Sequence, residues 1–536
     1  MSNKIISTKE AVNLIKDSQT LAIGGFVGFG IPEELLVSLK EKYLEEKSPR
    51  NLSIFYCAGI GDGKERGLNH LALEGLIGKL YCGHIGLAPK LGALVSKNIF
   101  PAYTVPQGVT VHMLRAIAGK KPGVLTHVGL KTFADPRIEG CCANELAKED
   151  SIVDALNIDG RDWLLYKSFP IDVCFIKATT ADIHGNLTFE NEALFADQLS
   201  MAEATKNSGG IVIAQVERVT EYGTLNAQNV RVHSHLVDYI VIGEDKNNCQ
   251  SFLFDKFIPE WTGQIRRPLD SLEKMPLNPR KICGRRSALE IKKNMLVNLG
   301  IGVPEAVASV ASEEGVSEQF TLTIESGVMG GVPASSLGIG ATYNPDAIHE
   351  QGFIFDLYDG GGIDVACLGA AQIDEKGNVN VSKFAGRVVG PGGFVNITQN
   401  SKKVIFCGTF TAKGLKTEIV DGKLKITNEG KSKKFIKEVE QITFSADYSN
   451  ESGQEVLYVT ERAVFQLTKN GPKLIEIAPG VNLQKDILDQ MDFRPIISEN
   501  LTEMDFRIFK QDPMDLVLEE EPIEFLVKAE PSKQII

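Results

Sequence analysis

Residues 172–188 read DVCFIKATTADIHGNLT, and residues 364–380 read DVACLGAAQIDEKGNVN. The two stretches align without a gap. The matching pairs are Asp172 with Asp364, Val173 with Val365, Ala178 with Ala370, Asp182 with Asp374, Gly185 with Gly377, and Asn186 with Asn378. Each stretch is typical of a buried β-strand that ends in a tight turn. The repeat predicts that the chain contains the same structural unit twice.

A second correspondence precedes the first one in each half of the chain. Residues 21–35, LAIGGFVGFGIPEEL, and residues 296–307, LVNLGIGVPEAV, each read as a strand, a glycine loop and a helix that begins near a proline. Strand patterns such as 210–216 alternate with helical patterns such as 32–45. We therefore predict an α/β fold with two related open α/β halves in one chain.

The division between the halves is predicted at residues 264–286, QIRRPLDSLEKMPLNPRKICGRR. Three prolines interrupt regular structure there, and charged residues are frequent. We expect an N-terminal half over 1–263, a linker over 264–286, and a C-terminal half over 287–536. The charged tail beyond Asn500 receives no assignment.

Composition excludes several classes of protein. The chain has 43% hydrophobic and 24% charged residues, a net charge of -12 and a pI near 5.4. A nucleic-acid-binding protein needs a basic surface, so nucleic acid is not an expected partner. No run of 18 apolar residues and no apolar segment near Met1 indicates a membrane span or a secretion signal. The nine scattered cysteines fit free thiols, the eight histidines lack metal-ligand spacing, and we expect a cytoplasmic protein without a metal.

Glu325 is the residue with the strongest chemical signal. It follows residues 320–324, FTLTI, a strand pattern with apolar side chains on one face, and it precedes the small residues SGVMGGVP. Ligands bind at the carboxyl ends of strands in open α/β sheets. A carboxylate, with a reference pKa of about 4.3, is ionised near neutral pH and can attack a thioester carbonyl without a general base. The alternative is a helix-capping or solvated turn residue.

Two glycine loops are candidates for backbone contact with a ligand. Residues 24–30, GGFVGFG, lie between a strand and a helix, but their spacing fits neither a dinucleotide fingerprint nor a P-loop. Residues 390–394, GPGGF, could supply N–H groups to an oxyanion. The alternatives are close strand-to-helix packing for the first loop and a plain turn for the second. The third glycine run, 360–362, is predicted to be a structural turn.

Together these segments resemble family I CoA-transferases. The resemblance rests on GGFVGFGIPEEL, TLTIESGVMGGVPA, GGGIDVACLGAAQIDEKGNVN, GPGGFVNIT, YVTERAVF and IAPGVNLQKDILDQMDF, and it extends over nearly the whole chain. Within the family, the chain is most similar to the propionate or acetate type, the short-chain acyl CoA-transferases whose two halves are fused.

The resemblance implies an active site at the interface of the halves and a ping-pong reaction through a glutamyl-CoA thioester on Glu325. It implies that Gly392 and Gly393 form an oxyanion hole near the CoA thioester. The residues of the first glycine loop that it places facing the substrate are Gly24, Gly25, Phe26, Gly28 and Gly30. CoA is then a substrate and covalent intermediate, and no cofactor is tightly bound. The expected partners are acyl-CoA, short-chain carboxylates and identical subunits in a homotetramer or homodimer.

Three alternatives stay open at this stage. An acyl-CoA hydrolase would form the same thioester and admit water. A non-catalytic acyl-CoA-binding sensor could use the same scaffold, because fold does not fix function. Citrate-lyase-type acyl exchange is the third. The sequence Ile324-Glu325-Ser326-Gly327 differs from the S-E-N-G of some family members, so a strict acetoacetate preference is not expected, and the preferred acid is undetermined.

Overall fold

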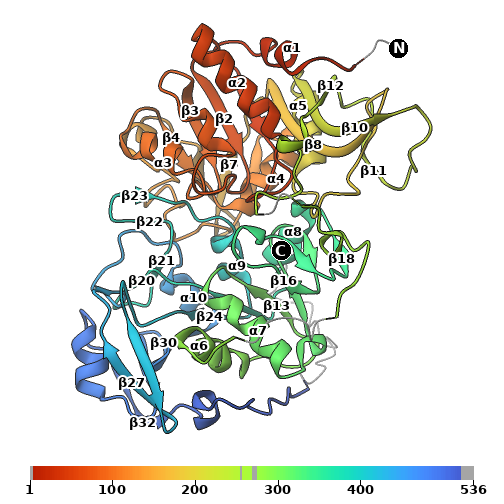
Figure 1. Ribbon diagram of the computed structural model, residues 1–536. Coiled ribbons are helices and arrows are strands. Elements are labelled where there is room, and N and C mark those ends of the chain that lie inside the picture. The colour runs from red at the N-terminus through yellow and green to blue at the C-terminus, as the bar shows by residue number, and fades with distance from the viewer. Residues whose placement is uncertain (1–3, 254–255, 269–274, 521–536) are drawn as a thin grey trace.

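The computed structural model describes residues 4–253, 256–268 and 275–520. It contains two α/β halves, with the N-terminal half above the C-terminal half in Figure 1. Each half is organised around its own twisted, largely parallel sheet. The predicted fold class is confirmed.

The first sheet has the central parallel order β12-β10-β8-β1-β2-β3-β4. Its strands are β1 (Thr20–Ile23), β2 (Leu52–Tyr56), β3 (Ile77–Cys82), β4 (Ala102–Thr104), β8 (Val173–Asp182), β9 (Leu187–Thr188), β10 (Ile211–Thr220), β11 (Val230–Val232) and β12 (Tyr239–Ile242). Strand β8 is buried along its whole length, as expected for a central strand that is covered on both faces.

The second sheet runs in the order β18-β15-β14-β13-β19-β24-β29-β30-β31-β32. Its strands are β13 (Leu296–Leu299), β14 (Thr321–Thr323), β15 (Val328–Met329), β18 (Ala347–Ile348), β19 (Val365–Leu368), β24 (Lys403–Cys407), β29 (Glu455–Val459), β30 (Ala463–Thr468), β31 (Gly471–Ile477) and β32 (Ile496–Glu503). The parallel part is β14-β13-β19-β24-β29. It repeats the order β2-β1-β8-β10-β12 of the first sheet.

The repeated sequence forms the same turn in both halves. Asp182 Oδ1 accepts hydrogen bonds from the backbone N–H groups of His184 and Asn186, and Asn186 Nδ2 donates to Asp182 Oδ2 at 2.7 Å. Asp374 and Asn378 repeat this arrangement. The glycines inside the two turns have φ values of 98° and 95°, which explains their identity. The duplication therefore preserves a local hydrogen-bonding motif.

The first aspartate of each repeat also has one role in both halves. Asp172 accepts a hydrogen bond from the N–H of Thr20, the first residue of β1, at 2.7 Å. Asp364 accepts one from the N–H of Leu296, the first residue of β13, at the same distance. These bonds fix the start of one strand beside its neighbour.

Helices cover both faces of each sheet. They are α1 (Thr8–Asn13), α2 (Glu33–Glu46), α3 (Pro89–Ser96), α4 (Gln107–Ala118), α5 (Gln198–Asn207), α6 (Pro279–Ala288), α7 (Ala306–Glu313), α8 (Gln351–Asp359), α9 (Phe394–Asn400) and α10 (Ala446–Ser452). Helices α4, α5, α8 and α9 contribute to one hydrophobic core that continues from the first half into the second. The halves thus meet through buried apolar surface.

The structure gives part of the predicted linker and part of the tail beyond Asn500, which the sequence left unassigned, a definite place in the second half. Part of the predicted linker, 269–274, lies outside the described residues, and α6 begins within the linker at Pro279. Beyond Asn500, Arg285 donates hydrogen bonds to backbone carbonyls of Ile508, Lys510 and Asp512. Residues 508–512 of the tail are therefore held against α6, and residues 521–536 lie outside the described part.

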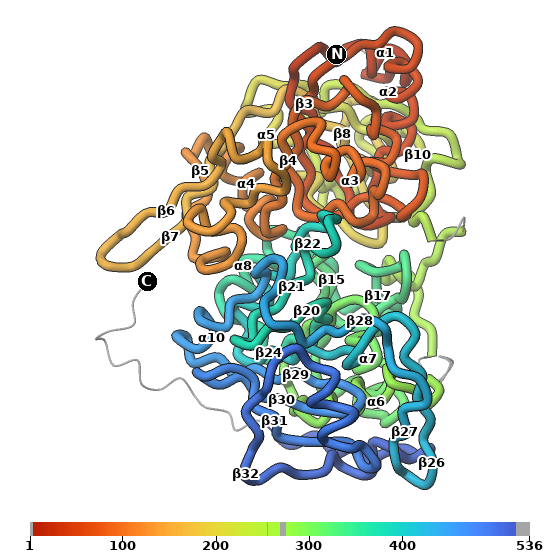
Figure 2. Tube along the Cα trace, turned by 90° about the vertical axis from the view of Figure 1, so that its left-hand side faces the viewer, coloured from red at the N-terminus to blue at the C-terminus, as the bar shows by residue number. Residues whose placement is uncertain are grey.

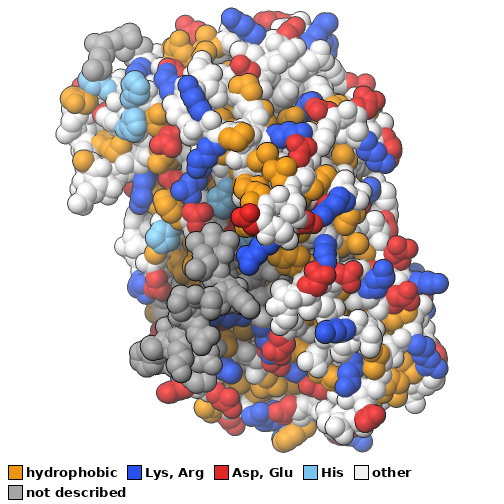
Figure 3. Space-filling model, turned by 180° about the vertical axis from the view of Figure 1, so that it is seen from behind, with side chains coloured by type: hydrophobic (Ala, Val, Ile, Leu, Met, Phe, Trp, Pro, Cys, Tyr) orange, Lys and Arg blue, Asp and Glu red, His pale blue; other side chains and the backbone are white. Residues whose placement is uncertain are grey.

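The surface carries two further features. The hairpin of β6 (Val153–Ile158) and β7 (Arg161–Lys167) projects from the first half, as Figure 2 shows. On the face seen from behind, acidic and basic side chains are interspersed (Figure 3). No helix of the described residues combines the length and the apolar character that a membrane crossing requires.

Candidate active site

A large cavity lies between the two halves, at the carboxyl ends of the second sheet's strands. Its volume is about 1020 Å³. Residues that follow β13, β14, β19 and β24 line it, and Glu325 is among them. The first half contributes Phe26, Val27, Gly59, His84, Leu87 and Gln107. Both halves are therefore needed to form the cavity.

Buried polar side chains hold the end of β14, two residues before Glu325. Asn298 Nδ2 donates to the carbonyl of Thr323 at 3.1 Å and to the hydroxyl of Tyr358 at 3.2 Å. The hydroxyls of Thr323 and Tyr358 are 2.9 Å apart. Because a buried, connected network of this kind fixes side-chain positions, it fixes the backbone from which Glu325 projects.

The two residues after Glu325 have structural roles. Ser326 is fully buried, and its hydroxyl donates to the carbonyl of Gly340 at 2.6 Å. Gly327 has a φ of 108°, and a Cβ atom there would lie 2.0 Å from the carbonyl oxygen of His349. The E-S-G sequence thus turns the chain sharply after the carboxylate and anchors the turn.

Glu325 and Gly393 are in direct contact across the cavity floor. The backbone N–H of Gly393 donates a hydrogen bond to the Glu325 carboxylate. A Cβ atom built on Gly393 would lie 1.8 Å from Glu325 Oε2. Only glycine permits this approach, so the structure brings together two residues that sequence analysis named separately.

Burial dominates the electrostatics of Glu325. The surrounding atoms remove water from the carboxyl group and raise its pKa to about 7, although the Gly393 hydrogen bond acts in the opposite direction. No ion pair to Glu325 occurs among the described residues. The expectation of full ionisation at neutral pH, based on the ordinary pKa, therefore does not hold.

Gly392 has a different position from Gly393. Its N–H donates to the carbonyl of Gly83 at 2.9 Å, and its carbonyl accepts from the N–H of Gln107 at 2.9 Å. Since its donor is already engaged by the first half, Gly392 does not present a free N–H to an oxyanion in this structure. Gly392 lines the cavity and ties the loop to the opposite half.

The first glycine loop contributes side chains to the cavity more than bare backbone. Phe26 and Val27 line the cavity, but Gly24, Gly25, Gly28 and Gly30 do not. A Cβ atom on Gly24 would lie 2.4 Å from Gln198, and one on Gly28 would lie 3.0 Å from Phe252. Close packing therefore explains these glycines, and the packed loop presents Phe26 to the site.

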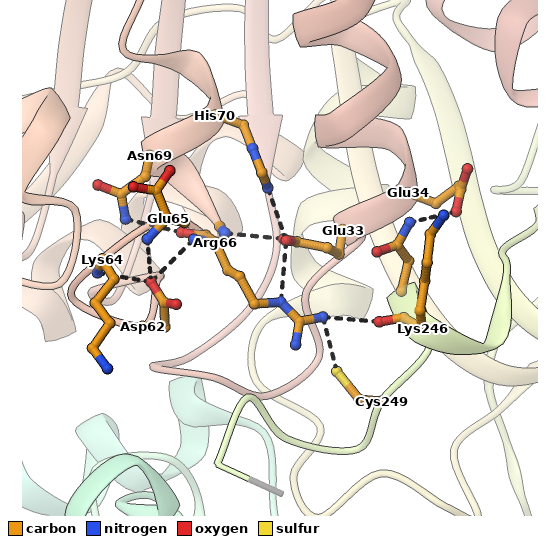
Figure 4. A network of polar contacts seen from close by, with 12 residues as sticks. Glu33, Glu34, Asp62, Lys64, Glu65, Arg66, Asn69, His70, Lys246 and Cys249 are labelled. Carbon is orange, nitrogen blue, oxygen red and sulfur yellow. Dashed lines mark hydrogen bonds and ion pairs between the residues drawn. The ribbon is translucent and has the colours of Figure 1, made fainter. Parts of the chain in front are cut away.

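A buried network holds the elements on which this loop rests (Figure 4). Glu33, in the first turn of α2, accepts hydrogen bonds from Arg66 Nε at 3.3 Å and from the N–H of Gly67 at 2.9 Å, and it contacts His70 Nε2 at 2.9 Å. Arg66 stacks over the ring of Phe252, whose N–H donates to the Gly28 carbonyl. The ion pair of Glu33 with Arg66 and the contact of Arg66 with Phe252 thus hold the glycine loop on the side facing away from the cavity.

The cavity has chemically different ends. On the β15 side of Glu325, an apolar cluster combines residues of both halves; it includes Phe26, Phe29, Leu194, Val328, Ala334 and Ala341, with Leu87 and Leu337 packed against it. At the β24 side, the lining includes Lys413, Lys433 and Lys434. Glu325 lies between an apolar end and a cationic end.

Sequence analysis missed two residues of the first half that line the cavity. Gln107 is buried at the start of α4, and its Nε2 donates to Gln351 Oε1 at 3.1 Å. His84 lies between Gly59 and Gly86, and burial lowers its pKa to about 4, so its imidazole is neutral. A glutamine at the start of a largely apolar helix is the one sequence signal that could have revealed Gln107.

Comparisons with known proteins identify the family of this chain. The profile of the family described as Coenzyme A transferase matches residues 5–243. The chain is 48% identical over 522 residues to a caffeate CoA-transferase of Acetobacterium woodii, with 96% of this chain and 99% of the relative aligned. It is 44% identical over 519 residues to the acetate CoA-transferase YdiF of Escherichia coli (strain K12), covering 96% and 97%. The crystal structure of an Escherichia coli O157:H7 acyl-CoA transferase as a thioester complex with CoA superposes with a TM-score of 0.91, 43% identity, and 97% and 98% coverage.

Proposed function

Since this chain belongs to the family I CoA-transferases, we propose that it moves CoA between short-chain carboxylic acids of the acetate and propionate type, through a glutamyl-CoA thioester on Glu325. The chain is an enzyme that transfers CoA, and its fold consists of two CoA-transferase-type halves. The contact between the Glu325 carboxylate and the Gly393 N–H, inside a cavity formed by both halves, is the observation that supports this proposal most strongly.

In the first step, a Glu325 oxygen attacks the acyl-CoA carbonyl, the carbon–sulfur bond breaks, and CoA leaves as a thiolate. The product is a mixed anhydride of Glu325 and the acyl group. The thiolate then attacks the glutamyl carbonyl carbon, and the donor acid leaves as a carboxylate. An acceptor carboxylate repeats these steps in reverse and leaves as the new acyl-CoA. Bonds of similar energy are exchanged, so no ATP is required.

Each attack on the glutamyl carbonyl places negative charge on a Glu325 oxygen. The Gly393 N–H already donates to this carboxyl group, so it can stabilise the oxyanion without reorganisation. The raised pKa indicates a carboxylate that is weakly solvated and without a counter-cation, which favours its attack on a carbonyl. The elevated pKa and the nucleophilic role thus have one cause, the removal of water.

Dependence on an acceptor acid tests this proposal against the hydrolase and sensor alternatives. Purified protein with propionyl-CoA and acetate is expected to form acetyl-CoA and propionate in equal amounts. Without acetate, we expect no more product than one equivalent per active site. Continuous release of free CoA without an acceptor would support the hydrolase, and absence of any turnover would support the sensor.

The apolar end of the cavity supports a specific class of acid. Phe26, Leu87 and Leu337 lie there, and no lysine or arginine lines this end among the described residues. A second carboxylate bound there would lose its hydration without gaining a counter-ion, at a cost of several kcal/mol. The acyl groups that fit are those of apolar monocarboxylic acids. The neighbouring relatives act on acetate or caffeate by name, and both are monocarboxylic.

We expect propionate to be a better acceptor than succinate by at least about 100-fold in kcat/KM, because succinate would bury an unpaired charge. The Leu337→Arg variant should lower kcat/KM for propionate at least about tenfold. It should also bring the kcat/KM values for propionate and succinate closer together. Leu44→Arg, at an exposed position of α2 outside the cavity, is the matched control and should change neither the kcat/KM for propionate nor its ratio to that for succinate. Equal use of the two acids by the unaltered enzyme would contradict an apolar acyl site.

The pH dependence of the first half-reaction follows from the pKa of Glu325, which is raised to about 7. The ionised carboxylate is the reactive form, and protonation below the pKa removes it. We therefore expect kcat/KM for propionyl-CoA to be constant above pH 8 and to fall about tenfold per pH unit below about 7. Stopped-flow measurements in buffers without carboxylic acids give this profile. A constant kcat/KM down to pH 5.5 would mean that Glu325 keeps its ordinary pKa.

We further propose an N-terminal half over 1–263, a linker over 264–286 and a C-terminal half over 287–536, an active enzyme that is a homotetramer or homodimer, and a location in the cytoplasm. The projecting β6–β7 hairpin, with Leu156 and Ile158 exposed, offers apolar surface that a second subunit could cover. CoA acts as substrate and intermediate, and no tightly bound cofactor is proposed.

A further inference from the structure

We infer that Lys434, at the cationic end of the cavity that Lys413 also lines, forms the subsite that binds the diphosphate of CoA. This inference rests on the proposed function for the nature of the ligand. It goes beyond the proposed function because it says which end of the cavity holds the nucleotide part of the substrate. The acyl-transfer chemistry at Glu325 does not determine that end.

Lys434 differs from its neighbours in lacking a partner. Lys433 forms an ion pair with Asp492 at 2.9 Å. The Lys434 side chain, by contrast, forms no hydrogen bond or ion pair within the described part of the chain, although it is mostly buried and lines the cavity. Burial lowers its pKa, so in the free protein the ammonium group lacks both water and a counter-ion.

The buried carboxylate of Glu461 is near Lys434 but forms no ion pair with it. Its negative charge favours the protonated form of Lys434 and so raises the pKa of that lysine. Its own oxygens are engaged, however, because it accepts from Arg462 Nε at 2.7 Å and from the N–H of Phe410 at 2.8 Å. Arg462 also pairs with Glu429. The donors of Lys434 are therefore available for an anion in the cavity.

The distance from Glu325 to Lys434 suits the pantetheine arm of CoA. A Cβ atom on Gly408, which follows β24 directly, would lie 3.2 Å from Lys434 Nζ. In the sheet, β24 is separated from β14 by β13 and β19. Neighbouring strands are about 4.8 Å apart, so the lateral separation is roughly 14 Å.

The register adds a smaller component along the strands. Thr323 is level with Asn298, Asn298 with Ala366, and Ala366 with Val404. Gly408 therefore lies two residues further along than Glu325, or about 7 Å, and the combined separation is roughly 16 Å. A pantetheine arm contains about as many bonds as four residues of extended chain, or about 14 Å. With the thiol at Glu325, the diphosphate reaches Lys434.

The direction of the substrate follows from the same geometry. The acyl group and the CoA sulfur are bonded to one carbonyl carbon, so they must extend to different sides of Glu325. The apolar cluster occupies the β15 side, and the unpaired ammonium group lies toward β24. CoA therefore extends across β13 and β19, and the acyl group points toward Phe26.

The test compares donors that differ only in their phosphates. Dissociation constants of CoA, dephospho-CoA and pantetheine are measured by calorimetry, together with kcat/KM for the three propionyl thioesters with acetate as acceptor. We expect Lys434→Gln to weaken binding of CoA and dephospho-CoA about ten- to a hundredfold and to lower kcat/KM for their thioesters to the same degree. Values for pantetheine and propionyl-pantetheine should not change.

Two matched variants serve as controls. Lys437→Gln removes an exposed lysine of the same segment that does not line the cavity, and it should leave all values within about twofold. Lys434→Arg keeps the charge and should retain most of the affinity for CoA, with unfolding temperatures confirming that each variant is folded.

Equal losses with pantetheine, or no loss with CoA, would overturn the inference, and a loss confined to CoA would assign Lys434 to the 3′-phosphate instead of the diphosphate. Phosphate-dependent CoA binding through Lys434 in a protein without transfer activity would sustain the subsite and refute the proposed function.

Discussion

The Glu325→Gln variant is expected to lose CoA transfer by on the order of 10⁴-fold or more while remaining folded. Glutamine keeps the size of the side chain and can still accept a hydrogen bond from the Gly393 N–H. Its neutral amide oxygen cannot form a stable anhydride or thioester. The initial rate of acetyl-CoA formation from propionyl-CoA and acetate measures the loss.

Glu350 provides a control of the same residue type. Burial raises its pKa to about 7, as for Glu325, but it does not line the cavity. Glu350→Gln should therefore transfer CoA at close to the normal rate. Glu325→Asp, which withdraws the carboxylate by one methylene, should lose on the order of 100-fold. Near-normal transfer by either Glu325 variant would exclude Glu325 as the nucleophile.

Gly393→Ala is the second substitution with a large expected effect. Its Cβ atom would lie 1.8 Å from Glu325 Oε2, so the carboxylate and the loop cannot keep their positions. Displacing the nucleophile and its N–H donor together should lower kcat/KM on the order of 10³-fold. Steady-state kinetics with propionyl-CoA measure this effect.

Gly92→Ala tests whether any glycine substitution would have this effect. Gly92 lies in α3, and no atom lies within 4 Å of the Cβ atom that alanine would add. Activity should be unchanged, and the helix should gain about 1 kcal/mol because alanine has the higher helix propensity. If Gly393→Ala were as active as Gly92→Ala, the loop could not hold the position that the structure gives it.

The fold was predictable because the duplicated signal is local. Asp182, Gly185 and Asn186 form one turn by hydrogen bonds among themselves, and Asp374, Gly377 and Asn378 form its copy. Because all hydrogen bonds of this turn form within five consecutive residues, its sequence does not depend on how the rest of the unit changes. The strand before Glu325 was predictable for a similar reason, since alternation of apolar residues in the sequence indicates strand geometry, although the polar Thr323 proves to be buried as well.

The environment of Glu325 was not predictable, because it depends on residues from distant parts of the chain. Gly393 comes from the loop before α9, Asn298 from β13, and Gln107 from the other half. Burial of the carboxyl group where these parts of the chain meet raises the pKa of Glu325 to about 7, although the hydrogen bond from Gly393 lowers it, whereas the sequence suggests an ordinary pKa. Only the assembled interface shows this.

The glycine loops show how one pattern can have two causes. Gly393 is required by its contact with Glu325, whereas Gly24 is required by its contact with Gln198. In the sequence, both appear as small residues between a strand and a helix. From the sequence, ligand contact was open for both loops, with close packing as the alternative for the first and a plain turn for the second, and the neighbouring side chains distinguish these possibilities.

The most direct test of this account is the mass of the protein after incubation with propionyl-CoA alone. We predict an increase equal to one CoA less one water, located on the peptide that contains Glu325. Acetate should discharge the adduct and yield acetyl-CoA. Consumption of propionyl-CoA with no adduct on Glu325, or with an adduct on another residue, would contradict the covalent mechanism.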